Sequence, residues 1–333
     1  MTTGGTGAMT TGGTGAMTTG GTGAMSATLA PRVVVVSRRS ELDELLAHHG
    51  TRAAAGYYLR QRGRDLAGVV ARHEALQAAL TTVGAAIPAD WRRGRADRAD
   101  LARFPFAPED VVIAVGQDGL VANVAKYLDG QPVIGVDPEP GRNAGVLVRF
   151  RPAAIARLLP EVVAGRAPVR DRTMVRAALD DGQELIGLNE IYAGDPGHQS
   201  ARYLLSTADG RRERQSSSGL VVGTGTGATG WCASIARERA AAPSPPAPDE
   251  PALCWFVREA WPSPATGASL TAGRLGPDQT LEIVAERERL VVFADGLEAD
   301  HLTMSWGQRL TVGPAGRRLR LVEPASQQGR PAP

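Results

Sequence analysis

The sequence predicts an α/β plus β protein, in which a Rossmann-like α/β domain precedes a mainly antiparallel β domain. Two patterns carry this prediction. In the first half, short β-branched runs alternate with segments of helical periodicity, which is typical of a parallel sheet flanked by helices. In the second half, strand-like pieces follow one another with few helices, which favours antiparallel pairing. We expect the domains at 31–150 and 151–323, between a Gly/Thr repeat at 1–30 and a flexible tail at 324–333.

The composition excludes several classes of partner. The chain of 333 residues carries 37 basic and 35 acidic side chains, a net charge of +2, so no strong field favours nucleic acid or an anionic membrane. Two cysteines, Cys232 and Cys254, are too few for a disulfide framework or a structural zinc site. No apolar run is long enough to span a bilayer and no signal peptide is recognisable, so a soluble, cytoplasmic protein is expected.

The N-terminal repeat consists of copies of Met-Thr-Thr-Gly-Gly-Thr-Gly-Ala that start at Met1, Met9 and Met17. It offers no large apolar side chain except methionine, so burial cannot offset the entropy of ordering it. We therefore expect disorder, and each copy, like Met25, offers an alternative start codon.

Ordered structure is expected to begin at the valine-rich strand Arg32–Val36, which suits burial on both faces of a parallel sheet. Ser40 can cap the helix that follows. Helical periodicity returns at 52–61 and at 65–83. His73 falls on the apolar face of the second of these segments, which favours a packed core histidine.

The basic stretch 91–98 is expected to be a solvated loop, although its arginines leave a role near a phosphate open.

A sharp turn, Gly116-Gln117-Asp118-Gly119, follows the apolar strand 111–115. A strand, turn and helix in this order can direct backbone amides at an anion, and the glycines let a phosphate approach closely. Asp118 would then hold Mg²⁺ or accept a proton from a hydroxyl beside the phosphate, or it would only cap the helix. The apolar face of that helix is expected at Leu120, Val121, Val124 and Leu128, with Lys126 and Asp129 facing away.

A further buried strand at 132–136 completes the first half, and ligands of such sheets bind at the carboxyl ends of the strands. The second half should contain a helix at 153–159, a surface loop at 240–251 and a hairpin turn at Asp295-Gly296. Its strands are expected at 173–179, 184–192, 201–207, 219–223, 253–258, 280–284, 289–294 and 309–312.

Asn189 and Glu190 place an amide and a carboxylate side by side among apolar residues. Such a pair suits the hydroxyls of a ribose or an amide group, because it supplies donors and acceptors. Two polar residues in a half-exposed strand are the alternative.

The stretch 218–231 contains Gly-x-Gly-x-x-Gly at 225, 227 and 230 after an apolar strand, which would suit a dinucleotide oxidoreductase. That fingerprint also needs an acidic residue about twenty positions on, at the end of a second strand. Asp249 and Glu250 lie at that distance, but inside a proline-rich loop. We therefore favour a Gly/Thr loop that presents hydroxyls and amides to a ligand, with a tight-turn cluster as the alternative.

Taken in this order, the stretches resemble the NAD kinase family, in particular its mitochondrial-type branch and bacterial relatives. The resemblance covers roughly residues 110–322. The family's Gly-Gly-Asp-Gly-Thr is similar to 116–120, its Asn-Glu pair to 189–190, its Thr-x-Thr-Gly-Ser-Thr-Ala-Tyr loop to 224–231, its Gly-Val-Asn strand end to 135–137, and its late Asp-Gly turn to 295–296.

The resemblance implies transfer of a phosphoryl group from ATP, or from polyphosphate in some members, to the 2′-hydroxyl of the NAD adenosine ribose, giving NADP. Asp118 takes the position of the base for that hydroxyl. A divalent cation such as Mg²⁺ would arrive with the nucleotide, with Asp118 as a further ligand and no direct metal cluster. Family resemblance also implies NAD between the two domains of a homo-oligomer. Phosphate contacts would come from Gly116, Gly119 and Asn123, and NAD contacts from Asn189, Glu190, Thr224, Thr226, Gly227 and Thr229.

Several residues depart from the family pattern. Gln117 replaces a glycine and Leu120 a threonine, and a backbone that needed a positive φ at 117 would strain glutamine. Ala228, Gly230 and Trp231 are further departures. Two alternatives therefore stay open: a catalytically degenerate NAD(H) sensor, and a related lipid or small-molecule kinase with a deep apolar cleft in the β domain.

Overall fold

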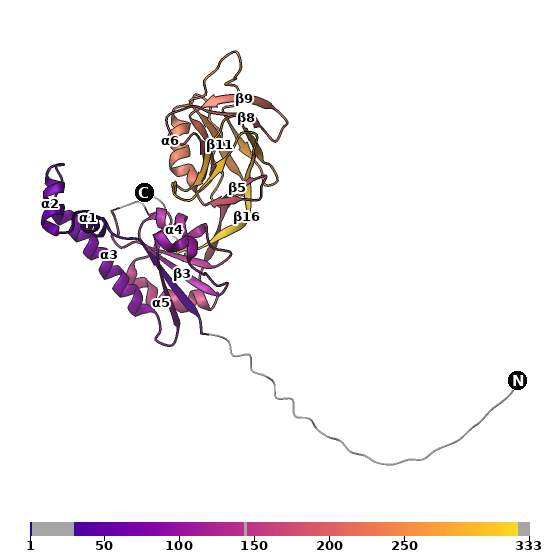
Figure 1. The fold of residues 1–333 in the computed structure, drawn as a ribbon. Coiled ribbons are helices and arrows are strands. Elements are labelled where there is room, and N and C mark those ends of the chain that lie inside the picture. The colour runs from indigo at the N-terminus through magenta and orange to yellow at the C-terminus, as the bar shows by residue number, and fades with distance from the viewer. Residues whose placement is uncertain (2–29, 143–144, 326–333) are drawn as a thin grey trace. The chain divides into compact units, whose positions relative to one another are not determined.

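The computed structural model describes Met1 and residues 30–142 and 145–325 (Figure 1). The described residues from 31 onward form one unit, and residues 1–30 are separate from it. The disorder expected for the Gly/Thr repeat concerns residues that, from 2 to 29, lie outside the described part, as do residues 326–333 of the expected tail. No helix in the described ranges is long and apolar enough to cross a membrane.

A parallel sheet forms the first half, in the strand order β2-β1-β3-β4. β1 and β3 are buried along almost their whole length, as expected for strands covered on both faces. The strands are β1 (Arg32–Ser37), β2 (Arg92–Asp97), β3 (Asp110–Val115) and β4 (Pro132–Val136).

The expectation of a solvated loop at 91–98 is wrong, because Arg92–Asp97 is the edge strand of this sheet. The segment has little apolar content of its own. Its backbone pairs with the valines of β1, Val34 opposite Gly94, while most of its side chains stay partly exposed. Pairing with a buried neighbour therefore overrides the polar sequence.

Helices cover both faces of the parallel sheet. α3 and α5 pack against Val33, Val35 and Ile113 on one face, and α4 packs against the alternate residues of the same strands on the other. The helices of this half are α1 (Glu41–His49), α2 (Arg52–Arg60), α3 (Leu66–Ala86), α4 (Asp118–Ala125) and α5 (Ile155–Val163), with 3₁₀ turns η1 (Arg98–Arg103) and η2 (Pro152–Ala154).

The predicted Ser40 cap of the first helix is present, and a glycine cap closes its other end. Ser40 accepts a hydrogen bond from the Asp43 amide, the Asp43 carboxylate accepts one from the Ser40 amide, and Gly50 ends the helix at a φ of 76°. His73 is half-buried, and its Nδ1 lies 2.8 Å from the Ser40 hydroxyl, so it braces α3 against that cap.

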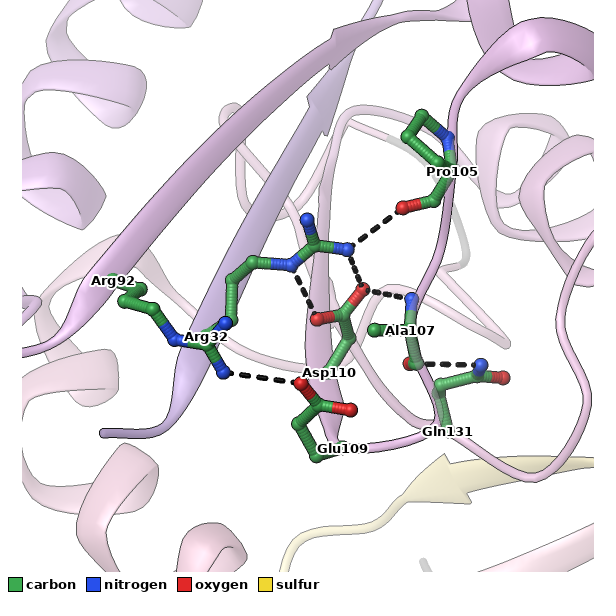
Figure 2. A network of polar contacts seen from close by, with 7 residues as sticks. All are labelled: Arg32, Arg92, Pro105, Ala107, Glu109, Asp110 and Gln131. Carbon is green, nitrogen blue, oxygen red and sulfur yellow. Dashed lines mark hydrogen bonds and ion pairs between the residues drawn. The ribbon is translucent and has the colours of Figure 1, made fainter. Parts of the chain in front are cut away.

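A polar network fixes the amino-terminal edge of the sheet (Figure 2). Arg32 on β1 and the fully buried Asp110 on β3 are register partners, and two guanidinium nitrogens of Arg32 each donate to Asp110 at 2.6 Å. Asp110 also accepts from the Ala107 amide at 2.8 Å. Since breaking a buried pair is strongly unfavourable, this network holds the register that aligns the opposite, carboxyl ends of the strands.

Antiparallel strands make up the second half and enclose one large apolar core. The sequence missed three of them, β9, β12 and β15, which are short or polar. The strands are β5 (Val169–Leu179), β6 (Glu184–Gly187), β7 (Glu190–Gly194), β8 (Ala201–Ser206), β9 (Arg212–Ser217), β10 (Gly219–Thr224), β11 (Leu253–Arg258), β12 (Ala272–Leu275), β13 (Leu281–Ala285), β14 (Leu290–Ala294), β15 (His301–Met304) and β16 (Arg309–Val322), with η3 (Gly227–Thr229) and α6 (Trp231–Arg237).

Strand β16 joins the two halves. Its first residues pair antiparallel with β13, whereas Arg320 and Leu321 pair parallel with β4, next to Pro132 and Val133. β5 accompanies it for most of its length, and Figure 1 shows the two strands side by side. The parallel strands thus belong to one ten-stranded sheet that faces a separate six-stranded sheet across the β core. The predicted α/β plus β fold class is confirmed.

Candidate active site

The carboxyl ends of the parallel strands meet at one edge, where β3 runs into the glycine turn. The Gly116 amide donates to the Val136 carbonyl at 3.0 Å, which ties the turn to the end of β4. Gln117 is the N-cap of α4 with an extended backbone, φ −98° and ψ 167°. No positive φ is needed there, so glutamine causes no strain. Leu120 is buried in the core and packs beneath the turn, where a Cβ on Gly116 would lie 3.1 Å from its Cδ2, so an apolar residue suits this position.

Asp118 is the first residue of α4, and both oxygens of its carboxylate accept hydrogen bonds from backbone amides. Oδ1 accepts from the amides of Leu147 and Val148 at 2.8 and 3.0 Å, and Oδ2 accepts from Val146 at 2.9 Å. The same segment lies so close to β4 that a Cβ on Gly135 would come within 2.0 Å of the Leu147 carbonyl oxygen. Asp118 therefore fastens the segment after β4 onto the start of α4.

Asn123, expected at the phosphates, is buried in α4. Its Oδ1 accepts a hydrogen bond of 2.6 Å from Nε of Arg98, the first residue of η1. The last arginine of the basic stretch is therefore held beside α4, at the end of β2. Gly119 lies exposed in the first turn of the helix.

Asn189 and Glu190 lie where β6 ends and β7 begins, and their backbone amides bind the carboxylate of Asp295. Asp295, which follows β14, accepts from the amides of Leu188, Asn189 and Glu190 at 2.8, 2.7 and 3.2 Å. Burial nevertheless raises the pKa of Asp295 to about 6. The expected hairpin turn at Asp295-Gly296 is thus a structural support of the Asn-Glu pair, with Asp295 at a φ of 53°.

The side chain of Glu190 has no hydrogen-bond or ion-pair partner among the residues that the structure describes. Burial, and then the charge of Asp295, raise the pKa of its carboxyl group to about 7. It is therefore a carboxylate whose protonation changes near neutral pH.

The Gly/Thr loop packs directly on this pair. Thr224 donates through its hydroxyl to the Leu188 carbonyl at 2.6 Å and through its amide to the Asn189 carbonyl at 2.9 Å. Its hydroxyl also accepts from the amides of Thr226 and Gly227. A Cβ on Gly227 would lie 2.1 Å from the Asn189 carbonyl oxygen, so only glycine permits this approach.

Two hydroxyls of the loop differ in their surroundings. Thr226 is 6% exposed, and its Oγ1 is buried without a hydrogen-bond partner in the described part of the chain. Thr229 is exposed and donates to the Thr226 carbonyl at 3.2 Å. A buried hydroxyl without a partner is costly, and a water molecule or a ligand atom can satisfy it.

The residues predicted from the sequence fall into two groups, from which Asn123 is set apart by its bond to Arg98. Gly116, Asp118 and Gly119 gather at the edge of the parallel sheet, whereas Asn189, Glu190 and the 224–229 loop gather in the β half.

Lys126 and Asp300, which the sequence analysis missed, connect the two groups. Lys126, expected to face away from the core, has a side chain only 3% exposed that donates to Asp300 at 2.6 Å. α4 is buried nearly all round, so the assumption of a solvent face was wrong. Lys126 is the only lysine of the chain, and this is the one feature of the sequence that could have pointed to it.

An open cavity of about 480 Å³ lies on the face of the six-stranded sheet that carries Tyr192. The ring of Tyr192 stacks on that of Trp231, with ring centroids 5.6 Å apart. The ring of Phe293 also packs against Tyr192, with centroids 4.9 Å apart. Charged side chains, Arg258 and Glu298 among them, complete the lining. Strand alternation puts Glu190 on the same face as Tyr192.

The described residues contain no group of three or more His, Cys, Asp or Glu side chains that could hold a metal ion. Both oxygens of Asp118 already accept backbone amides.

Comparison with known proteins gives related sequences, although no family model matches the chain. The NAD kinase of Chlorobaculum tepidum is 24% identical over 137 residues, 40% of this chain and 46% of the relative. That of Saccharophagus degradans is 32% identical over 38% of this chain and 44% of the relative. That of Pseudomonas putida KT2440 is 27% identical over 65% of this chain and 71% of the relative. The chain thus spans less than half the length of the first two relatives.

Among solved structures, the crystal structure of yeast NADH kinase complexed with NADH is similar, with a TM-score of 0.57 over 90% of this chain and 85% of that chain. At 14% sequence identity this match shows the fold. The predicted resemblance to the NAD kinase family is confirmed by these relatives and this fold.

Proposed function

We propose, from its resemblance to the NAD kinases, that this chain transfers a phosphoryl group from a nucleotide to the 2′-hydroxyl of the adenosine ribose of NAD, giving NADP. One observation carries the proposal. Asn189 and Glu190 meet the Gly/Thr loop at a junction where a carboxylate and the buried Thr226 hydroxyl both lack partners among the described residues. A ribose diol supplies the donors and acceptors that such a junction needs.

The donor phosphates would bind at the other group of residues. The amides of the Gly116–Gly119 turn and the N-terminus of α4 favour an anion, and Asp118 keeps the neighbouring segment 146–148 in place. Mg²⁺ bound to the phosphates would offset their charge, which is most of what phosphoryl transfer requires. We expect ATP as the donor, with polyphosphate as the alternative.

Asn189, Thr224, Gly227 and Thr229 would position the NAD, through the loop contacts described above. We further propose a homo-oligomer in the cytoplasm, where the free thiols of Cys232 and Cys254 suit a reducing environment.

A second candidate function is an NAD(H) sensor without turnover. The engaged carboxylate of Asp118 favours it, because a carboxylate that holds three amides is less available for chemistry. The exchange of Gln117→Gly together with Leu120→Thr discriminates: activity that appears only in this variant would support the sensor. A lipid kinase is disfavoured by the charged lining of the cavity beside Tyr192.

The test is NADP⁺ formation by the protein that starts at Met25, with NAD⁺, Mg²⁺ and either ATP or polyphosphate, detected with an NADP-specific dehydrogenase. Turnover with one donor supports the kinase and identifies that donor. Binding of NAD in calorimetry without turnover would favour the sensor, and absence of both would refute the dinucleotide proposal.

A further inference from the structure

We propose that Cys232 and Cys254 form a redox-sensitive pair, which a small neutral hydroperoxide oxidises to a disulfide, and that this bond displaces the Gly/Thr loop 224–229. The pair lies beside the candidate site and takes no part in the proposed reaction. The disulfide and the displacement are independent of the proposed function, whereas their effect on NAD binding rests on it.

Both thiols lie against one residue, Gly223 of β10. Cys254 on β11 is the register partner of Gly223, and its Sγ donates to the Gly223 carbonyl oxygen at 3.7 Å. Cys232 on α6 covers the same glycine, because a Cβ built there would lie only 2.4 Å from its Sγ. Register partners carry their Cβ atoms on one face of the sheet, about 4.5–5.5 Å apart. The Sγ of Cys232 therefore lies next to Cys254.

The two thiols also interact with each other. The Cys232 thiol donates a hydrogen bond to Cys254, which lowers the pKa of the Cys254 thiol in spite of its burial. Arg274 of β12, the register partner of Cys254, acts in the same direction. The same hydrogen bond, together with burial, raises the pKa of Cys232. Cys254 is thus the sulfur that loses its proton first, and Cys232 is the thiol beside it that completes a disulfide.

A cavity of about 230 Å³ is lined by both cysteines. It lies between α6, the proline-rich loop 240–251 and β11, whose alanine, proline and phenylalanine side chains line it together with Arg237. Hydrogen peroxide is small and uncharged, so it enters such a space at a lower desolvation cost than a charged reagent. The two thiols are only 2% and 1% exposed, which excludes bulky disulfides.

Oxidation by hydrogen peroxide proceeds in two steps. The thiolate of Cys254 attacks one peroxide oxygen, the O–O bond breaks, and the hydroxide that leaves takes up a proton to become water. The sulfur of Cys232 then attacks the sulfenic acid at Cys254, the S–O bond breaks, and the departing hydroxide takes the Cys232 proton. The two thiols give up two electrons to the peroxide, and two water molecules are formed.

Closure of the disulfide draws the start of α6 towards β11. Glu190, Gly223 and Cys254 are register partners in a row across β7, β10 and β11. Cys232 covers the middle of this row, where the charge of Glu190 also reaches it. Bonded sulfurs lie about 2.05 Å apart, closer than two thiols in contact. The bond therefore moves Cys232 away from Glu190 and towards Cys254.

The Gly/Thr loop has to follow this movement, since it runs directly into α6. Gly227 packs against the Asn189 carbonyl oxygen, and the amides of Thr226 and Gly227 donate to the Thr224 hydroxyl at 3.1 and 3.2 Å. Pulling the end of the loop towards β11 loosens these contacts. If the loop positions NAD as proposed, a displacement of about 1 Å weakens NAD binding by about tenfold or more.

Thiol counting in the full chain tests the disulfide. The reduced protein is treated with hydrogen peroxide, catalase stops the reaction, and a chromogenic thiol reagent counts the free thiols in denaturant. We expect both thiols of the chain to disappear, a single-chain band on a non-reducing denaturing gel, and a peptide that links Cys232 to Cys254 in mass spectrometry. Dithiothreitol should restore both thiols. Retention of both thiols, or links only between chains, would overturn the proposal.

Single-cysteine variants test which thiol reacts first. In Cys232→Ala the sulfenic acid at Cys254 has no partner thiol, so dimedone should label it. In Cys254→Ala the thiol of Cys232 should react at least about tenfold more slowly, because its pKa is raised. Equal rates in the two variants would overturn the assignment of Cys254 as the attacking sulfur.

Hydrogen exchange tests the displacement in the absence of NAD. The amides of Thr226 and Gly227 should lose protection in the oxidised wild type, whereas those of β1 and β3 should not change. The double variant Cys232→Ala with Cys254→Ala, treated with the same peroxide, controls for oxidation of methionine and should keep its protection. Unchanged protection of the loop in the fully oxidised wild type would overturn the displacement.

Calorimetry with NAD connects the pair to the proposed function. The oxidised wild type should bind NAD about tenfold more weakly than the reduced protein and regain its affinity in dithiothreitol, whereas peroxide should not affect binding by the double variant. Equal affinity of the reduced and oxidised wild type would overturn the effect of the pair on the site. No NAD binding by the reduced protein would refute the proposed function, and the thiol count and hydrogen exchange would still decide the disulfide and the displacement.

Discussion

At the scale of single residues, the site contains carboxylates whose surroundings oppose their charge. Glu190 is the clearest case, because burial and Asp295 raise its pKa to about 7 from an ordinary value of 4.5. A group with a raised pKa in the folded state favours folding when protonated. Its contribution is therefore complete below pH 4.5 and is lost as the pH rises through 7.

Glu190→Gln tests this argument, since glutamine resembles the protonated acid. We expect the variant to be more stable than the wild type by on the order of 1–2 kcal/mol at pH 8, with the difference shrinking towards pH 5. Urea unfolding at both pH values measures it. Glu184→Gln is the control and should show no such trend, because Glu184 is exposed and paired with Arg176. If the difference in unfolding free energy between Glu190→Gln and the wild type were the same at pH 5 and pH 8, the argument would be contradicted.

Residue types revealed part of the site because their chemistry is visible in sequence. The Gly116–Gly119 turn and the Asn189-Glu190 pair stand out among apolar neighbours. The hydrogen bonds from three amides to Asp295 cannot be recognised in this way. Asp-Gly after a strand is the same sequence whether it closes a hairpin or supports another segment. Contacts over more than a hundred positions, such as those of Asp295 with Leu188 and Asn189, leave no local pattern.

At the scale of elements, α4 couples the two groups of site residues. It begins with Asp118 and ends next to Lys126, whose ammonium group donates to Asp300 at 2.6 Å. Tyr127 donates to the same carboxylate at 2.9 Å. Asp300 lies in the loop that Asp295 begins. The end of α4 is thus bonded to the loop whose first residue, Asp295, supports Asn189 and Glu190.

A double-mutant cycle of Lys126→Met and Asp300→Asn measures this coupling. Because Lys126 is buried, we expect a coupling free energy of about 1.5–3 kcal/mol in unfolding, and weaker NAD binding in each single variant. The matched control is the pair Arg176–Glu184, with both side chains nearly half exposed, where less than about 1 kcal/mol is expected. Equal coupling in the two cycles would refute a role for Lys126 beyond that of a surface ion pair.

Strands were predictable where their own residues form a continuous apolar run. β1, β3, β4 and β11 are continuous apolar runs, and the structure contains each of them close to the expected bounds. β2 and β9 were missed because arginine and serine dominate them, and their strand conformation comes from pairing with β1 and β8. Strand propensity depends on such neighbours more than on the segment itself.

At the scale of the whole molecule, the last strand, β16, returns to pair with β4 in the sheet that the first half of the chain begins. Leu321 pairs with Val133 of β4 and is fully buried, and Leu319 and Val322 are each 2% exposed. The sequence predicted a strand only at 309–312, because Gly313 and Pro314 follow, a combination that normally ends a strand. The structure accommodates them with an irregularity between Pro314 and Arg318, after which the pairing with β5 resumes.

Truncation tests the importance of this returning strand. A chain that ends at Arg317 loses Leu319, Leu321 and Val322, whose burial stabilises the fold by about 1.5–3 kcal/mol each. Since domains of this kind are stable by about 5–15 kcal/mol in total, we expect loss of cooperative unfolding and of hydrogen-exchange protection in β4. A chain that ends at Ala325 keeps the strand, and we expect its unfolding midpoint to match that of the full chain. Equal protection of β4 in both truncated chains would mean that the parallel sheet is stable without its fifth strand, and that the two halves of the site are joined mainly through Lys126 and Asp300.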